Sequence, residues 1–231
     1  MSRLGRKKRN KNQIELVAYN YPRISVSEHF RLIRTNILYS AVNDKEIKSI
    51  VVTSPEKGDG KSTTAANLAI VLAQQGKKVL LVDSNLRTPS LHLAFNMINN
   101  RGLTSVLKKT LYLDEAITKS YIPNLDVLTS GPIPLNPSEL LNSDAMEVIM
   151  KEIYADYHYI VFDTPPALSV TDAQILANKC DGVVLVITSR KTQKSTALEA
   201  KELLEKARSR FLGVVINRIQ RKKPKLVKRI N

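Results

Sequence analysis

The segment IKSIVVTSPEKGDGKSTTAANLAIVLAQQG, residues 47–76, determines the class of fold that we expect. It opens with a short apolar run at 47–54, whose length and β-branched residues are typical of a buried strand. A loop rich in glycine follows, and residues 61–76 then place apolar side chains on one helical face, with Gly76 as the stop. The segment therefore predicts a strand, a loop and a helix in direct succession.

The loop of this segment carries the residues of a phosphate-binding loop. Its glycines let consecutive backbone N–H groups point at one phosphate, and the helix N-terminus adds a favourable dipole. Lys61 would reach the outer phosphates, and the Ser62 hydroxyl would hold Mg²⁺. Pro55 stands where the strict pattern has glycine, and a glycine-rich turn that only caps the helix is the alternative. The nucleotide-binding residues predicted here are Gly58, Asp59, Gly60, Lys61, Ser62 and Thr63.

Apolar runs and helical patterns alternate along the rest of the chain. Near-continuous apolar strands separated by helices indicate a parallel sheet that is covered on both faces. We therefore expect an α/β fold, a P-loop ATPase-like and mostly parallel sheet with helices on both faces. The predicted strands are 47–54, 78–83, 124–131, 159–163, 182–188 and 212–217; the helices are 61–76, 143–157, 172–179 and 192–209, with irregular or short helical material over 88–121.

Two of these strands end in an aspartate. Asp83 closes the run VLLVD, and Asp163 closes YIVFD. Because the carboxyl ends of parallel strands share one edge of the sheet, both acids should lie near Lys61. Asp163 is suited to hold a water molecule that is bound to Mg²⁺. Asp83 either positions and deprotonates an attacking hydroxyl or supports the metal. The catalytic candidates are therefore Lys61, Asp83 and Asp163, and the metal candidates are Ser62, Asp83 and Asp163.

The positive charge of the chain is concentrated at its two ends. The formal net charge is +15, yet six basic residues lie in 1–11 and seven in 218–231, without an acid in either segment. We interpret 1–24 as a basic flexible arm, 25–217 as one domain and 218–231 as a basic tail. Such tails favour an anionic surface, phospholipid or nucleic acid, or serve solubility. The single cysteine, Cys180, excludes an internal disulfide, and the apolar runs, 183–187 among them, are far too short for a membrane helix.

Four motifs together resemble the bacterial tyrosine kinase (BY-kinase) family, over about 25–217. The first is the Gly-acid-Gly-Lys-Ser loop. The second is VLLVDSNLRTP at 79–89, which matches four apolar residues followed by Asp-x-Asp-x-Arg-x-Pro except at one place. The third is the apolar strand with Asp-Thr-Pro-Pro at 159–166. The fourth, GPIPLNPSELL at 131–141, is similar to a segment of these kinases that other P-loop ATPases do not need.

The resemblance implies transfer of the ATP γ-phosphoryl group to a tyrosine hydroxyl, with ATP and Mg²⁺ as cofactors and Asp83 orienting the phenol. It implies that Asn217 contacts adenine, and that Glu28, Arg31 and Arg34 in an oligomerisation helix at about 27–40 join subunits of a ring. It also implies a separate transmembrane adaptor, in capsular or extracellular polysaccharide synthesis and export. We then expect a cytoplasmic protein held peripherally at the inner face of the membrane by its basic tails, without a specific nucleic acid.

The chain departs from the family pattern at several places. Asn85 replaces the second aspartate of the 79–89 motif, and we expect weaker metal binding as a result. The last tyrosine is Tyr159, so a C-terminal tyrosine cluster is absent, and Tyr19 and Tyr21 in the arm become the most accessible tyrosines. Glu56 replaces the lysine by which partition and division-site ATPases form nucleotide-sandwich dimers. The alternatives to a kinase are a catalytically weak ATP-binding scaffold and an ATPase switch that positions cargo on membrane or DNA.

Overall fold

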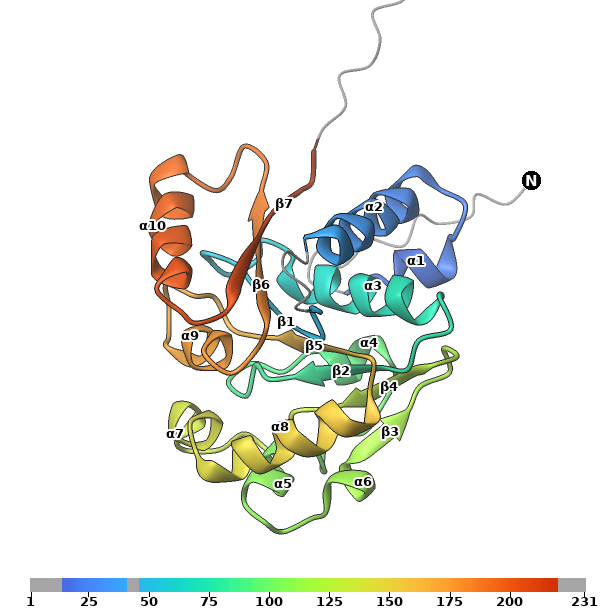
Figure 1. Ribbon diagram of the computed structural model, residues 1–231, viewed down its shortest axis with the longest axis vertical. Helices are drawn as coiled ribbons and strands as arrows, with labels where there is room; N and C mark the ends of the chain where they lie inside the picture. The colour runs from blue at the N-terminus through green and yellow to red at the C-terminus, as the bar shows by residue number, and fades with distance from the viewer. Residues whose placement is uncertain (1–13, 41–45, 220–231) are drawn as a thin grey trace, which may run out of the picture.

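The structure is a computed structural model that describes residues 14–40 and 46–219, and it is built on one seven-stranded sheet (Figure 1). The strand order is β3-β4-β2-β5-β1-β6-β7, and every neighbouring pair is parallel except β3 and β4. The strands are β1 (Ser49–Thr53), β2 (Val79–Asp83), β3 (Ile117–Lys119), β4 (Leu125–Leu128), β5 (Tyr159–Asp163), β6 (Gly182–Thr188) and β7 (Arg210–Asn217).

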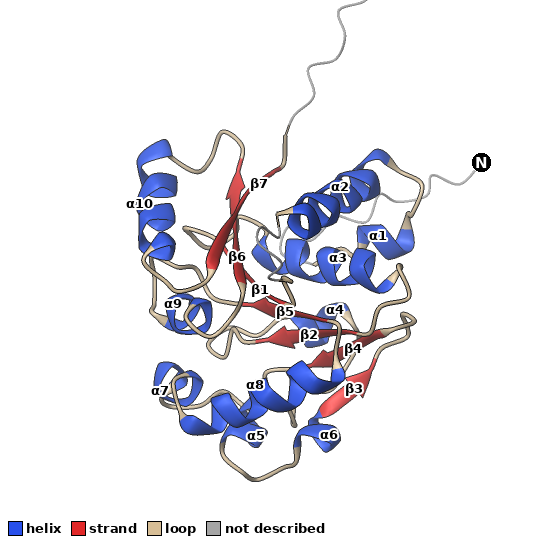
Figure 2. Cartoon of the chain, in the orientation of Figure 1, coloured by secondary structure: helices blue, strands red, loops and turns tan. Residues whose placement is uncertain are grey.

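Helices cover both faces of this sheet, as the sequence predicts (Figure 2). One face packs against α1 (Val17–Asn20), α2 (Ser25–Tyr39), α3 (Lys61–Ala73) and α4 (Leu91–Ala94). The other face packs against α5 (Leu103–Leu107), α6 (Leu113–Ala116), α7 (Pro137–Leu141), α8 (Asp144–Asp156), α9 (Asp172–Ala177) and α10 (Lys194–Glu205). Buried side chains of the central strands alternate between the two cores, which explains why these strands read as continuous apolar runs.

The register of the central strands brings their carboxyl ends together. Asp83 at the end of β2 pairs with Asp163 at the end of β5, and Val52 of β1 also pairs with Asp163. The loop that follows β1 leads directly into α3, which is buried along most of its length. The predicted strand–loop–helix segment is therefore confirmed, and it lies at the centre of the sheet.

The predicted flexible arm over 1–24 is wrong for its second half. Leu16 and Ala18 are buried, and α1 packs against α3. The side chain of Asn67 in α3 accepts the Ala18 N–H at 2.8 Å and donates to the Glu15 carbonyl at 2.8 Å. The sequence misleads here because this segment of four helical residues is held by tertiary contacts rather than by helix propensity. The basic segments 1–11 and 220–231 lie outside the described residues.

A smaller difference concerns the edge of the sheet. The region 88–121, predicted as irregular or short helical, also contains β3, which runs antiparallel to β4 at the edge of the sheet. Only three residues form this strand, too few for a periodic pattern to reveal it. Within the described residues, none of the helices combines the length and the apolar character that crossing a membrane requires.

Candidate active site

The loop between β1 and α3 has the backbone shape that its glycines predict. Gly58 and Gly60 have φ values of +88° and +94°, a region that L side chains rarely adopt. A Cβ atom on Gly60 would lie only 2.0 Å from Nδ2 of Asn217. Lys61 is the first residue of α3, so its amide lies at the positive end of a helix of 13 residues. This geometry suits a bound anion such as a phosphate group.

Lys61 faces the strand-end acid of β5. Its Nζ atom lies 3.5 Å from Oδ1 of Asp163 and donates a hydrogen bond to Oγ of Ser62 at 3.0 Å. Asp163 is fully buried, and this burial raises the pKa of its carboxyl group, while the charge of Lys61 opposes the rise. Neither oxygen of Asp163 has a hydrogen-bond partner within the described part of the chain. A buried carboxylate of this kind is suited to a ligand that brings positive charge.

Asp83 lies beside Asp163 on the neighbouring strand. Its Oδ2 atom accepts the backbone N–H groups of Ser90 and Leu91, both at 3.0 Å, whereas its buried Oδ1 has no partner among the described residues. Burial, together with the charge of Asp163, raises the pKa of Asp83 to about 7. The structure thus brings Lys61, Ser62, Asp83 and Asp163 to one edge of the sheet.

The side chain of Asp59, a predicted nucleotide-binding residue, is engaged within the protein. Its carboxylate is fully buried: Oδ1 faces the loop between β6 and α10, and Oδ2 accepts the Glu56 N–H of the phosphate loop at 3.4 Å. Lys191 and Thr192 of the loop between β6 and α10 contact Oδ1 at 3.3 and 3.2 Å. Only the backbone of Asp59 is left to face a nucleotide. Sequence reasoning missed this, because Lys191 and Thr192 lie more than 130 residues further along the chain.

Asn217 does reach the phosphate loop, from the last residue of β7. Its Nδ2 atom donates to the Asp59 carbonyl at 3.0 Å, and its Oδ1 accepts the Arg218 N–H at 2.8 Å. The predicted contact to adenine would therefore be made by a side chain that already touches the loop.

Asn85 is engaged within its own loop. Its Nδ2 atom donates to the carbonyl and the hydroxyl oxygen of Thr88 at 3.0 and 3.1 Å, and its Oδ1 accepts the Thr88 N–H at 3.3 Å. The amide therefore holds the turn that follows β2, a role to which an aspartate could contribute only acceptors. These hydrogen bonds give a structural reason for an asparagine, rather than the aspartate of the motif, at position 85.

Arg87 joins two of the sequence motifs. Its Nε and one terminal nitrogen contact the buried carboxylate of Asp172 at 3.1 and 3.3 Å, and the same terminal nitrogen donates to Oγ of Ser138 at 2.9 Å. Ser138, which lies in the GPIPLNPSELL segment, also donates to Asp172 at 2.6 Å. The segment after β2, whose Ser90 and Leu91 N–H groups bind Asp83, is thus fixed to α7 and α9. Sequence reasoning singled out neither Ser138 nor Asp172.

The predicted oligomerisation residues make contacts within the chain. Arg31 pairs with Glu28 and donates to the Pro22 carbonyl at 2.9 Å, while Arg34 donates to the Val71 carbonyl of α3 at 2.8 Å. Glu28 keeps 60% of its side chain exposed. These contacts leave Glu28 and Arg31 at the surface of α2, and they hold α2 against α3 through Arg34.

The expectation that Tyr19 and Tyr21 are the most accessible tyrosines is wrong. Among the described residues, Tyr39 and Tyr112 are 84% and 79% exposed, whereas Tyr19 and Tyr21 are 40% and 52% exposed. Tyr19 also packs edge to face against Tyr121, with ring centroids 5.3 Å apart.

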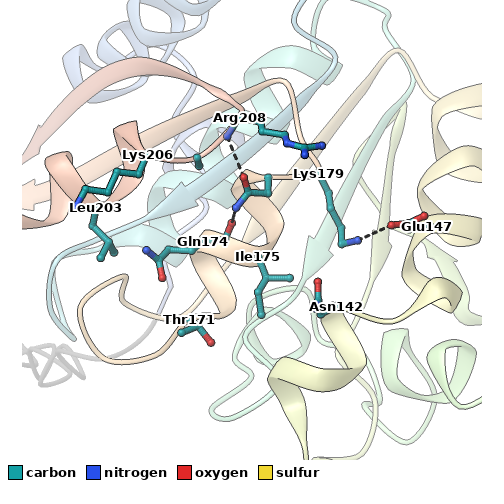
Figure 3. A pocket seen from close by; sticks show the side chains of 11 residues that line it. Asn142, Glu147, Thr171, Gln174, Ile175, Lys179, Leu203, Lys206 and Arg208 are labelled. Atoms are coloured by element: carbon teal, nitrogen blue, oxygen red, sulfur yellow. Dashed lines mark hydrogen bonds and ion pairs between the residues drawn. The ribbon is translucent and has the colours of Figure 1, made fainter.

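A surface pocket of about 440 Å³ lies away from this edge, between α8, α9 and α10 (Figure 3). Lys179 and Lys206, which line it, stand at the C-terminal ends of α9 and α10, where positive charge stabilises the helix carbonyls. Lys179 also pairs with Glu147 at 3.1 Å. None of the residues that line this pocket belongs to the phosphate loop or to the strand-end acids.

Known proteins that are similar to this chain carry a nucleotide-binding domain of the same class. Residues 47–209 match the family described as an AAA domain. The phosphate loop at the head of α3 and the two strand-end acids define, with this match, the class of P-loop ATPase-like nucleotide-binding proteins.

The particular family follows from relatives that match almost the whole chain. YwqD, a tyrosine-protein kinase of Bacillus subtilis (strain 168), is 52% identical over 205 residues, which cover 89% of this chain and 86% of YwqD. The solved chimerical protein CapA2B2 is 43% identical, with a TM-score of 0.86 and coverage of 89% and 90%. The kinase domain of the Escherichia coli tyrosine kinase ETK is 28% identical, with a TM-score of 0.86 and coverage of 95% and 84%. The chain belongs to the bacterial tyrosine-protein kinase family, as the four motifs predict.

Proposed function

We propose that the strand-end site described above transfers the γ-phosphoryl group of ATP to a protein tyrosine, in the synthesis or export of capsular or extracellular polysaccharide. The observation that carries this proposal is the buried pair of Asp83 and Asp163 beside Lys61 and the phosphate loop. Two adjacent buried carboxylates are costly unless a cation or a proton joins them.

The donor groups at this edge fit a magnesium-bound triphosphate. Three buried carboxylate oxygens of Asp83 and Asp163 lack a hydrogen-bond partner in the described part of the chain. Among the described residues, no group of three or more His, Cys, Asp or Glu side chains is placed to hold a metal. Mg²⁺ in phosphoryl-transfer sites is usually held by one or two carboxylates together with phosphate oxygens and waters. When bound, Mg²⁺ supplies charge neutralisation of the transferring phosphoryl group.

Each side chain then has a distinct role in the proposal. Lys61 contacts the outer phosphate oxygens, and Ser62 and Asp163 hold the metal and its waters. Asp83 orients the tyrosine hydroxyl and accepts its proton, because a carboxyl group with a raised pKa can take a proton near neutral pH. Asn217 contacts the adenine base in this proposal. Catalysis consists mainly of positioning and of electrostatic stabilisation.

The proposal includes partners beyond the nucleotide. We infer that a transmembrane adaptor acts with the kinase, which is in accord with the chimerical relative CapA2B2 and with the relative named CapB, a putative tyrosine-protein kinase of Staphylococcus aureus. We also infer a homo-oligomeric ring in which the exposed Glu28 and Arg31 contact a neighbouring subunit. The basic ends would hold the assembly at the inner face of the cell membrane.

One assay distinguishes this function from its alternatives. The protein is incubated with γ-labelled ATP, Mg²⁺, the cytoplasmic segment of an adaptor and a tyrosine-containing polymer. Phosphotyrosine supports the kinase; free phosphate alone supports an ATPase switch; absence of both supports a scaffold, the alternative that Asn85 favours. The variant Lys61→Met should lose the product, whereas Lys77→Met, which changes an exposed lysine, should keep it.

A further inference from the structure

Asp59 is a buried carboxylate in the middle of the phosphate loop. Its side chain is fully buried, and the burial of an unpaired carboxylate costs several kcal/mol, roughly. The nucleotide cannot compensate this charge, because a phosphate would repel it. The Glu56 N–H of the phosphate loop itself lies 3.4 Å from Oδ2, and the other groups that compensate the charge come from the loop between β6 and α10.

Lys191 is the cationic partner of this carboxylate. Its Nζ atom lies 3.3 Å from Oδ1 of Asp59 and donates to the Lys57 carbonyl at 3.1 Å. A Cβ atom on Gly58 would lie 3.6 Å from the same Nζ atom. Lys191 therefore bridges the two sides of the turn that the glycines allow.

Thr192 adds a second link to the same carboxylate. Its hydroxyl donates to Oδ1 of Asp59 at 3.2 Å and accepts the Thr188 N–H at 2.9 Å. The Asp59 carbonyl is also held, by the Thr188 hydroxyl at 3.3 Å and by Nδ2 of Asn217 at 3.0 Å. Side chain and backbone of Asp59 thus connect the phosphate loop to the ends of both β6 and β7.

Stabilisation of α10 does not explain the position of Lys191. The residue lies two places before Gln193, the N-cap of α10, where the positive end of the helix disfavours a cation. Its Nζ atom is directed at the phosphate loop instead, although half of the side chain remains exposed. The contacts with Asp59 and Lys57 account for this orientation.

We propose that Lys191 and Thr192 are positioning residues, which hold the phosphate loop in its nucleotide-binding shape through the buried carboxylate of Asp59. This inference rests on the proposed function only in taking the loop as the ATP site. Neither residue touches the phosphates in this account. Lys191 and Thr192 act by keeping the backbone N–H groups of the loop directed toward the phosphate position before ATP binds. The loop then loses less conformational entropy when ATP binds.

The test measures the dissociation constant of ATP by calorimetry, together with the KM for ATP and for a tyrosine-containing peptide. Lys191→Met should weaken ATP binding about tenfold and raise the KM for ATP to match, with the KM for the peptide unchanged. Lys191→Arg should restore most of the affinity. The matched control is Lys194→Met, an exposed lysine at the start of α10, which should behave as the parent chain does.

A double-mutant cycle keeps the test decisive even where one variant is unstable. Lys191→Met leaves Asp59 buried without its cation, so Lys191→Met with Asp59→Asn should bind ATP no more weakly than Lys191→Met alone. Additive losses, or equal affinities of Lys191→Met and Lys194→Met, would overturn the inference. A parent chain that binds ATP but forms no phosphotyrosine would contradict the proposed function, while the calorimetric comparison would still decide the role of Lys191.

Discussion

At the scale of single residues, the pair of Asp83 and Asp163 is the feature on which function depends most. Both carboxyl groups are buried, and the pKa of each is raised by that burial. The folded state therefore holds protons to a higher pH than the unfolded chain does. The free energy of unfolding contributed by Asp83 then falls as the pH rises from about 4 to about 7, and the contribution of Asp163 changes in the same direction.

This linkage predicts that Asp83→Asn stabilises the nucleotide-free protein. At pH 8 the neutral amide removes a buried charge, so the melting temperature should rise by about 2–4 °C, whereas the gain should vanish near pH 4. The same variant should lose phosphoryl transfer, since the amide cannot accept the phenolic proton. Thermal unfolding followed by circular dichroism from pH 4 to 8 checks the first point, with the exposed Glu202→Gln as control. A lower melting temperature at pH 8 would contradict it.

The sequence predicts which residues reach the site better than it predicts what their side chains do. Lys61, Ser62, Asp83 and Asp163 come together because loop chemistry and strand polarity are local properties that the motifs encode. The orientation of Asp59 depends on a loop that lies far along the chain, and no spacing rule reveals it.

At the scale of secondary-structure elements, the contact of Arg87 with Asp172 and Ser138 fixes the loop after β2. Arg87→Met would leave the buried carboxylate of Asp172 without its cation, and we expect a loss of about 2 kcal/mol in the free energy of unfolding. Urea unfolding measures it, and Asp172→Asn in the same chain should recover part of the loss. The exposed Arg101→Met is the control; a loss as small as that of the control would show that the network is not needed.

The N-terminal segment gives the second prediction at this scale. Leu16 is buried against the same core as α3, so Leu16→Ala should lower the free energy of unfolding by about 2–4 kcal/mol. Leu93→Ala, which truncates a side chain that is 74% exposed, should change it by no more than about 0.5 kcal/mol. Denaturant unfolding compares the two. Equal effects would mean that 14–24 behaves as the free arm that the sequence suggests.

Short elements such as α1 and β3 are harder to predict from the sequence than long ones. The long helices and central strands follow from periodicity, because each buries a complete face. The short helix α1 and the strand β3 follow from contacts with α3 and β4, and their own sequences carry too few residues for a pattern.

At the scale of the whole molecule, the chain joins a nearly neutral folded part to strongly basic ends. Each Lys or Arg near an anionic bilayer contributes about 1 kcal/mol. We therefore expect sedimentation with phosphatidylglycerol vesicles that weakens as salt is raised, and none with phosphatidylcholine vesicles. Replacement of the basic residues of 1–11 and 218–231 by glutamine should abolish it. Binding that survives this replacement would assign the membrane contact to the folded part.

The convergence of Lys61, Ser62, Asp83 and Asp163 on one magnesium-bound triphosphate is the claim on which the account rests. The measurement that tests it most directly is the affinity for ATP as a function of Mg²⁺ concentration. The parent chain should bind ATP more tightly as Mg²⁺ increases, Asp163→Asn should lose about tenfold of that gain, and Lys61→Met should bind weakly at every concentration. Parent-like curves for both variants would contradict the account.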